Sequence, residues 1–314
     1  MASFIIGLST LPRDDQILLL AQLNSITGWN ALSEGVHKGV YKAKKFVLGV
    51  SGKLASRFGA DDFSRQINRL DRNTEWNTEQ LAEKINSQVQ SLQKKNSSDL
   101  WLGIRARMAE IAGIKHDASD MMIADSIITK TASQLKVDLS NYHDSETREE
   151  QVFKACIEEQ VKKLQETISK MSTKQQEEYE EILRQELEKL SHADQEAIRK
   201  ATGLSDLSGQ ALLNFLKTTS GVVIAQMLVG ATGFGAFLFL TTSIHALALL
   251  LGIGLSFGVY TAATSALAFL LSGPFFFLVA GLAGGFLYYR TSEQLRGQLA
   301  KILIVTGRAH ALQC

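Results

Sequence analysis

One pentapeptide of the chain has the spacing of a hydrolase nucleophile. Gly254, Ser256 and Gly258 fit the pattern G-x-S-x-G, which places a serine at a sharp turn between a strand and a helix. Such a serine attacks a carbonyl only when a histidine base and an acid accompany it. This pentapeptide instead lies in a long apolar run that is typical of a helix. We therefore predict that Ser256 is not a nucleophile.

Two histidines occupy positions where ligand binding or proton transfer is conceivable. His116 is close to Asp117 and Asp120, but polar residues before a helix are more often its cap than a metal site. His245 is the only acidic or basic residue between Lys217 and Arg290, and its position near an expected turn favours a histidine at a membrane interface.

No other pattern in the sequence indicates an active site. There is no P-loop, no dinucleotide-binding glycine pattern after a strand and no H-E-x-x-H. Cys156 and Cys314 make neither a zinc pattern nor a disulfide framework. We therefore predict a protein that is not an enzyme, with no catalytic residues, no cofactor and no metal.

The dominant feature of the sequence is an apolar block at residues 218–289. As one helix these 72 residues would be about 108 Å long, whereas the hydrocarbon core of a bilayer is about 30 Å thick. The block must therefore fold back, and residues 241–245 and 272–274 are the expected turns. The alternatives are a buried hairpin inside a soluble bundle, and a hairpin that is sheathed at first and inserts later.

Glycines and aromatic residues in the block suit a membrane. Two pairs have GxxxG spacing, which permits close packing of helices in lipid: Gly254 with Gly258, and Gly281 with Gly285. Tyr288, Tyr289 and Arg290 resemble an interfacial belt. Both flanks of the block are basic, which favours an even number of crossings with both flanks in the cytoplasm.

The rest of the chain reads as helix nearly throughout. Only two prolines occur, and the long charged runs are rich in good helix formers. We predict an all-α protein: a helical soluble domain followed by a C-terminal, glycine-rich transmembrane helical block. The expected parts are an N-terminal amphipathic helical region (1–70), a polar helix or linker (71–99), a helical bundle (100–216), membrane-inserting helices (217–290) and a basic tail (291–314).

The N-terminal region contains a candidate basic amphipathic helix at residues 29–58. Its apolar residues recur at spacings of three and four, and lysines occupy the opposite face. This pattern fits a helix that packs on a protein core with its lysines in water, which we favour, or a helix on an anionic membrane surface. The candidate membrane-surface residues are Lys38, Lys42, Lys45 and Lys53.

Three segments resemble a known family. They are ITKTASQLKVDL, then EEQVFKACIEEQVKKLQETISKMSTKQQEEYEEIL, and VYTAATSALAFLLSGP within the apolar block. Together they are similar to the YaaW-like family of uncharacterised bacterial proteins, described as related to ubiquinol–cytochrome c chaperones. The resemblance covers about a quarter of the chain. It implies an assembly chaperone or a membrane-anchored scaffold, and it transfers no functional residues.

These observations lead to one expected function and one alternative. The leading expectation is a non-enzymatic protein that inserts into the bilayer, with pore formation by an oligomer of this chain as its mode of action. The alternative is the membrane-anchored scaffold or chaperone. The expected partners are lipid, further copies of the chain and a protein of unknown identity, but no nucleic acid, because an acidic stretch at residues 144–196 is the opposite of a basic footprint. The expected location is a bacterial inner membrane, with the soluble domain in the cytoplasm.

Overall fold

A computed structural model describes residues 2–33, 85, 87–230, 233–250 and 292–311. Every regular element in these ranges is an α-helix, which confirms the all-α prediction. Helices α1 (Ser3–Ser9), α2 (Arg13–Ser33), α6 (Ser97–Ala112), α7 (Asp120–Leu135) and α16 (Ser292–Ala311) form one group. Helices α9 (Thr173–Glu188), α10 (His192–Thr202), α11 (Gly209–Thr218), α12 (Gly221–Val229) and α13 (Gly233–Leu250) form a second.

Local sequence signals set most helix ends in the middle of the chain. Ser172 and Gln175 make a capping box at the start of α9, in which each residue bonds the other's backbone N–H. Ser191 caps α10, and Gly203 ends it in the left-handed conformation at φ 70°. Gly113 ends α6 in the same way at φ 76°. Each of these boundaries depends on residues within one turn, so the local sequence is enough to set it.

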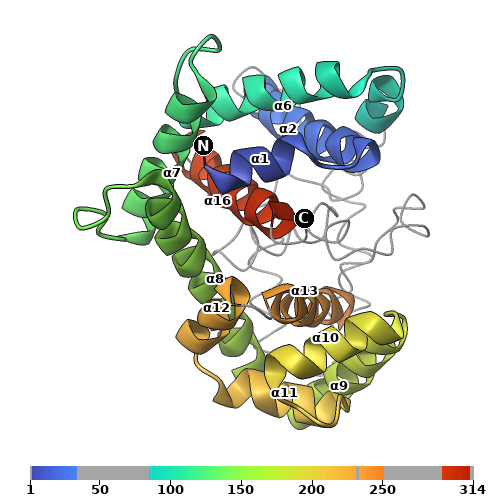
Figure 1. Cartoon of the computed structure of the whole chain (residues 1–314). Helices are drawn as coiled ribbons and strands as arrows, with labels where there is room; N and C mark the ends of the chain where they lie inside the picture. Colours follow the sequence, from blue (N-terminus) through green and yellow to red (C-terminus); the bar gives the residue numbers. More distant parts are fainter. Residues whose placement is uncertain (1, 34–84, 86, 231–232, 251–291, 312–314) are drawn as a thin grey trace.

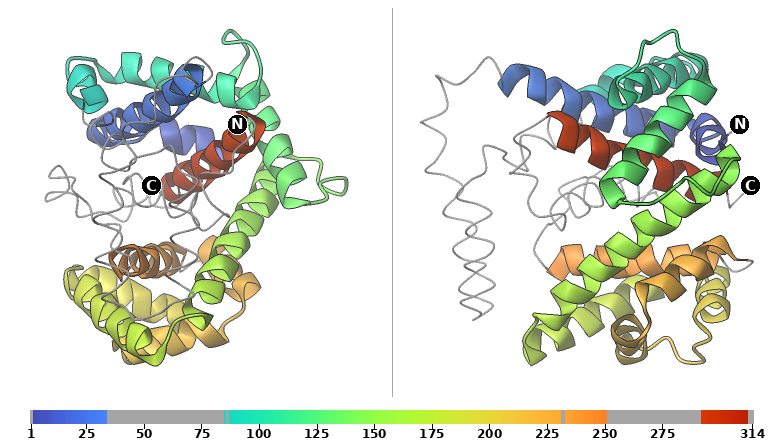
Figure 2. Two further views of the ribbon diagram at one scale, coloured as in Figure 1. Left: turned by 180° about the vertical axis from the view of Figure 1, so that it is seen from behind. Right: turned by 90° about the vertical axis from the view of Figure 1, so that its left-hand side faces the viewer.

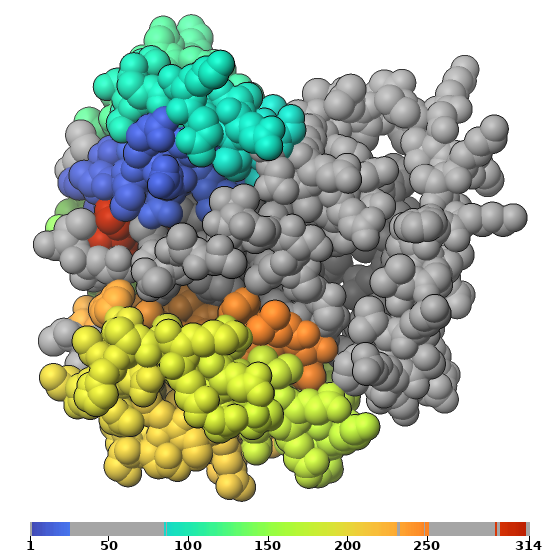
Figure 3. Space-filling view, turned by 90° about the vertical axis from the view of Figure 1, so that its right-hand side faces the viewer, coloured from blue at the N-terminus to red at the C-terminus, as the bar shows by residue number. Residues whose placement is uncertain are grey.

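The longest described helix, α8 (Ser145–Ser169), joins the two groups. Its apolar residues are spaced by three and four, and they are buried along its whole length. Its first half packs on α7 and α16, and its second half packs on α11 and α12. Figure 2 shows α8 passing from one group to the other in both views, and Figure 3 shows α2 and α6 on one side of the molecule and α9, α10 and α13 on the other.

The first part of the apolar block belongs to this helical body. Helix α13 packs on α9, α10 and α12, and its side chains from Ala236 to Ile244 are buried. The expected turn at residues 241–245 is wrong, because these residues lie inside α13. The expected bundle at 100–216 is in contact with part of the expected membrane block from 217, because α9 and α10 pack on α13. The start of the apolar block is divided between two helices, since α12 ends at Val229 and α13 begins at Gly233.

The end of the chain differs most from the sequence prediction. Residues 292–311 were expected to be part of a basic tail, but they form α16, and every residue from Leu299 to His310 is buried. The buried apolar residues of α16 pack on α1, α6, α7 and α8. Two basic side chains of α16, Lys301 and Arg308, have acidic partners on α8. A positively charged helix is therefore part of the core.

The N-terminal helices α1 and α2 are also more deeply buried than is usual for amphipathic helices, which were expected in this region. All residues from Gln16 to Leu23 of α2 are buried, and the helix continues to Ser33. Helix α1 makes its closest contact with α16 at Gly7 and Gly307. A Cβ atom on Gly307 would lie 2.1 Å from the carbonyl oxygen of Phe4, so only glycine permits this approach. The two ends of the chain are thereby joined (Figure 1).

Candidate functional site

Two polar contacts hold the apolar helix α13 to α9. The Tyr179 hydroxyl donates a hydrogen bond of 2.9 Å to the carbonyl oxygen of Ser243, and Tyr179 is fully buried. About two turns along α9 from Tyr179, Glu186 Oε2 lies 3.0 Å from His245 Nδ1. His245 is therefore not an interfacial histidine at a turn, as the sequence suggested. It is a half-buried group that pairs with a carboxylate of the bundle.

The carboxylate of Glu186 remains ionised in this setting. Burial raises its pKa, but the hydrogen bonds and charges of His245 and Lys189 together outweigh burial, so the pKa of Glu186 lies below its ordinary value. The folded-state pKa is lowered, so the stability that this carboxylate contributes is present at neutral pH and is lost only as the pH falls below about 4.5. The Glu186 carboxylate is thus ionised and available as a hydrogen-bond acceptor for α13 across the physiological range.

A carboxylate on α8 connects the two ends of the chain. Glu149 is completely buried, and its Oε1 accepts a hydrogen bond of 3.0 Å from the Phe4 N–H and one of 3.2 Å from Arg308 Nη1. Helix α1 has no side-chain cap of its own, so Glu149 satisfies one of its free N–H groups. Arg308 also lies 3.5 Å from Glu150 and over the ring of Phe153, with its Cζ 5.8 Å from the ring centroid.

A second ion pair holds the middle of α16 to α8. Lys301 Nζ lies 2.6 Å from Glu159 Oε2, and Lys163 Nζ lies 2.8 Å from the other oxygen of the same carboxylate. Burial raises the pKa of Glu159, but the two lysines outweigh it and the pKa is lowered. Since Glu149 pairs with Arg308 and Glu159 with Lys301, α8 and α16 run antiparallel. Breaking either pair would leave a buried charge without its partner, which costs more than the pair contributes.

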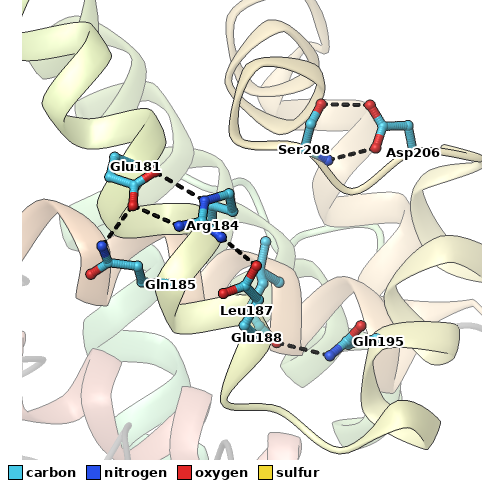
Figure 4. Close-up of polar contacts among 8 residues, drawn as sticks. All are labelled: Glu181, Arg184, Gln185, Leu187, Glu188, Gln195, Asp206 and Ser208. Carbon is cyan, nitrogen blue, oxygen red and sulfur yellow. Dashed lines mark hydrogen bonds and ion pairs between the residues drawn. The ribbon is translucent and has the colours of Figure 1, made fainter.

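The polar residues on the surface of the second group stabilise helix ends and turns. Arg184 pairs with Glu181 and Glu188 on α9 (Figure 4). Gln195 Nε2 donates to the carbonyl oxygens of Leu187 and Leu190 at the turn between α9 and α10. Asp206 accepts hydrogen bonds from Ser208, the residue that caps α11. These contacts are structural, since each lies within one turn or loop.

His116 and Asp120, which the sequence singled out for chemistry, have partners within the helical body, and Ser256 lies outside the described residues. Asp120 accepts a hydrogen bond of 2.6 Å from Arg105, and His116 lies 3.7 Å from Glu110. The cap of α7 is Ser119. Burial raises the pKa of the Cys156 thiol to about 12, so this thiol is unreactive. Within the described ranges, no group of three histidine, cysteine or acidic residues could hold a metal ion.

The predicted membrane residues lie outside the described residues. They are Lys38, Lys42, Lys45, Lys53, Gly254, Gly258, Gly281, Gly285, Tyr288, Tyr289 and Arg290. The structure therefore leaves these predictions as they were. It adds Tyr179, Glu186, Glu149 and Arg308, which the sequence reading missed. One signal in the sequence could have identified Glu149 as a buried carboxylate. It lies on the apolar stripe of its helix, one turn before Val152 and Phe153 on α8.

No single described helix is both long and apolar enough to cross a membrane. One bent pair, α11 and α12, meets the length and composition criteria when its two helices are taken together, and the angle between them is 106°. Comparisons with protein-family models, curated proteins and solved structures find no match to this chain. The resemblance to the YaaW-like family stays a prediction.

A pH prediction follows from the contact between α2 and the end of α16. Burial raises the pKa of Asp15 to about 6, although the nearby His310 of α16 lowers it and Asp14 raises it further. A raised pKa means that ionisation of Asp15 destabilises the folded state as the pH rises through about 6.

We expect Asp15→Asn to stabilise the protein by about 1 kcal/mol at pH 8, after allowance for partial solvent exposure, and to have little effect at pH 4. Urea unfolding followed by circular dichroism at both pH values tests this. A stabilisation at pH 8 no larger than at pH 4 would contradict it.

Proposed function

We propose that this protein is a non-enzymatic helical protein that inserts residues 251–291 into a lipid bilayer as a two-helix hairpin. Residues 251–289 contain no acidic, basic or histidine side chain. Two crossings need about 40 residues, which is the length of this segment. In this proposal the described helices form a body at one surface of the membrane, and the turn near Pro274 lies at the other.

The observation that carries the proposal is that both helices next to this segment are anchored in one body. Helix α13 comes before it and is held by Tyr179 and Glu186; helix α16 follows it and is held by Glu149 and Glu159. The end of α13 and the start of α16 lie at the same side of the body (Figure 2, right). A segment whose two ends return to one body crosses a bilayer an even number of times, and its length fits two crossings.

Pore formation requires several copies, because a single two-helix hairpin cannot enclose a water-filled path. We propose oligomeric pore formation as the mode of action. The second candidate, a membrane-anchored scaffold or chaperone, is favoured by the exposed apolar side chains of Leu102, Met121 and Met122 on α6 and α7. Dye leakage from liposomes by the purified protein supports the first; a stable partner that is lost when Met121 and Met122 are replaced by serine supports the second.

The topology can be tested with single cysteines. Cys156 is buried and unreactive, so Cys314→Ser provides a background in which Ser272→Cys or Ser205→Cys carries the only reactive thiol. Ser205 lies in the exposed loop between α10 and α11. We expect a membrane-impermeant maleimide to label these two positions from opposite sides of sealed vesicles. Labelling of both from one side, or release of the protein by carbonate, would contradict the hairpin.

A further inference from the structure

The junction between α11 and α12 has features of a hinge. The two helices are separated only by Thr219 and Ser220, and the chain turns by 106° there. Both separating residues have extended backbone: Thr219 has φ −86° and ψ 126°, and Ser220 has φ −65° and ψ 150°. The φ angles of both residues are already near helical values, so rotation about the ψ angles of Thr219 and Ser220 would convert this junction to helix.

A glutamine on α8 fixes the bent form. Gln165 Nε2 donates hydrogen bonds of 2.7 Å to the carbonyl oxygens of both Leu216 and Thr219. The last carbonyl groups of a helix have no partner within the helix, so an outside donor stabilises the point at which α11 ends. On the other side of the junction, the Ser220 hydroxyl caps α12 by accepting the Val223 N–H. Both contacts stop a continuous helix at this position.

Helix α12 is apolar on two faces, although only one is covered. Ile224, Ala225 and Leu228 are buried against the body, whereas Val222 is 50% exposed and Val223 is 44% exposed. Gln226 is the one polar side chain of α12 and is exposed, so most of the surface of this helix is apolar, which is typical of a helix inside a protein or in lipid. In lipid, the exposed valines would be covered, and the buried face would lose little because acyl chains are as apolar as its present neighbours.

We propose that the α11–α12 junction is a hinge that straightens at a bilayer, giving one continuous helix over residues 209–229. This helix would be about 31 Å long and would lie along the bilayer surface, so that α9, α10 and α13 stay on one side of the membrane. Gln210, Asn214 and Lys217 are exposed and are spaced by four and three, so they form a polar stripe along its first half, while Ser220 and Gln226 are exposed polar residues of its second half. A helix with such a stripe can lie at the interface with the stripe toward water and apolar side chains toward the acyl chains. The inference thus deepens the proposed function and rests on it.

The hinge can be locked by one substitution. Ser220→Pro suits the bent form, because Ser220 already has the φ of proline, Thr219 has the extended backbone that a residue before proline prefers, and no described hydrogen bond uses the Ser220 N–H. In a continuous helix the proline ring would clash with the carbonyl one turn before it. Ser220→Ala is the matched control, because it removes the same cap without forbidding the helix.

The test measures the bend directly and measures leakage separately. Spin labels at Gln210→Cys and Gln226→Cys, both exposed positions, are placed in the Cys314→Ser background. We expect their separation to lengthen to about 24 Å, the value for a continuous helix, when anionic lipid vesicles are added. The lengthening should occur with Ser220→Ala and should be absent with Ser220→Pro. Leakage of a vesicle-trapped dye should fall about a hundredfold with Ser220→Pro alone.

A second pair of variants acts in the opposite direction. Gln165→Leu removes both hydrogen bonds that fix the bend and should raise the straight fraction about tenfold. Gln195→Leu removes a similar pair of bonds at the α9–α10 turn and should not change the spin-label distance (Figure 4). A distance that stays short in vesicles for both wild type and Gln165→Leu overturns the hinge, even if the protein leaks dye. Leakage by none of the variants, together with a lengthened distance, refutes pore formation and leaves the hinge intact.

Discussion

Replacement of Gly307 by alanine is expected to separate α1 from α16 and to destabilise the protein by at least about 3 kcal/mol. The new Cβ atom would lie 2.1 Å from the carbonyl oxygen of Phe4, which belongs to the backbone of α1 and cannot turn away. The helices would have to move apart, which would also strain the hydrogen bond from Phe4 to Glu149. The effect should appear in urea unfolding of the full chain in mild detergent, followed by circular dichroism.

Gly297 provides the matched control, because it lies on the same helix and has a different kind of neighbour. A Cβ atom there would meet the side-chain amide of Gln134, which is the end of a flexible side chain. Gly297→Ala should therefore change the free energy of unfolding by less than about 1 kcal/mol, since alanine also favours helix. Equal effects of the two substitutions would show that α1 and α16 do not pack as described.

The second large effect is expected at the buried pair on α8 and α16. Arg308→Met should cost about 3–5 kcal/mol at neutral pH, because it leaves the completely buried Glu149 carboxylate without its cation. Burial already raises the pKa of Glu149 and Arg308 lowers it, so removal of Arg308 raises the pKa further. A raised pKa gives stability that is lost as the pH rises through it, so this variant should regain stability as the pH is lowered.

The double variant Glu149→Leu with Arg308→Met distinguishes the charge from the packing. It should recover most of the lost stability, because apolar side chains of similar volume often replace a buried ion pair without loss. It should remain about 1 kcal/mol below the wild type, since the Phe4 N–H loses its acceptor. If Arg308→Met alone stays within 1 kcal/mol of the wild type at neutral pH, Glu149 does not depend on Arg308.

The predictions for Gly307 and Arg308 both concern α16, whose burial is not evident from the sequence. The basic residues after the apolar block gave the appearance of a solvated tail. In the structure, Lys301 and Arg308 are buried because α8 supplies Glu159 and Glu149 opposite them. Charge along a single helix does not reveal whether a complementary charge lies across from it. A pairing between residues so far apart in the chain could not be read from local patterns.

The sequence by itself determined the helical class and the ends of the helices in the middle of the chain. Caps such as Ser172 with Gln175, and terminators such as Gly113 and Gly203, act within one turn, so neighbouring residues suffice to predict them. Only the tertiary structure decided where the apolar block divides. Hydropathy cannot distinguish burial in protein from burial in lipid. The groups that hold α13, the Tyr179 hydroxyl and the Glu186 carboxylate, belong to α9, and each lies more than fifty residues before its partner in the sequence. It also decided that α1 and α16 meet, because the contact between Gly7 and Gly307 depends on the fold of the whole chain between them.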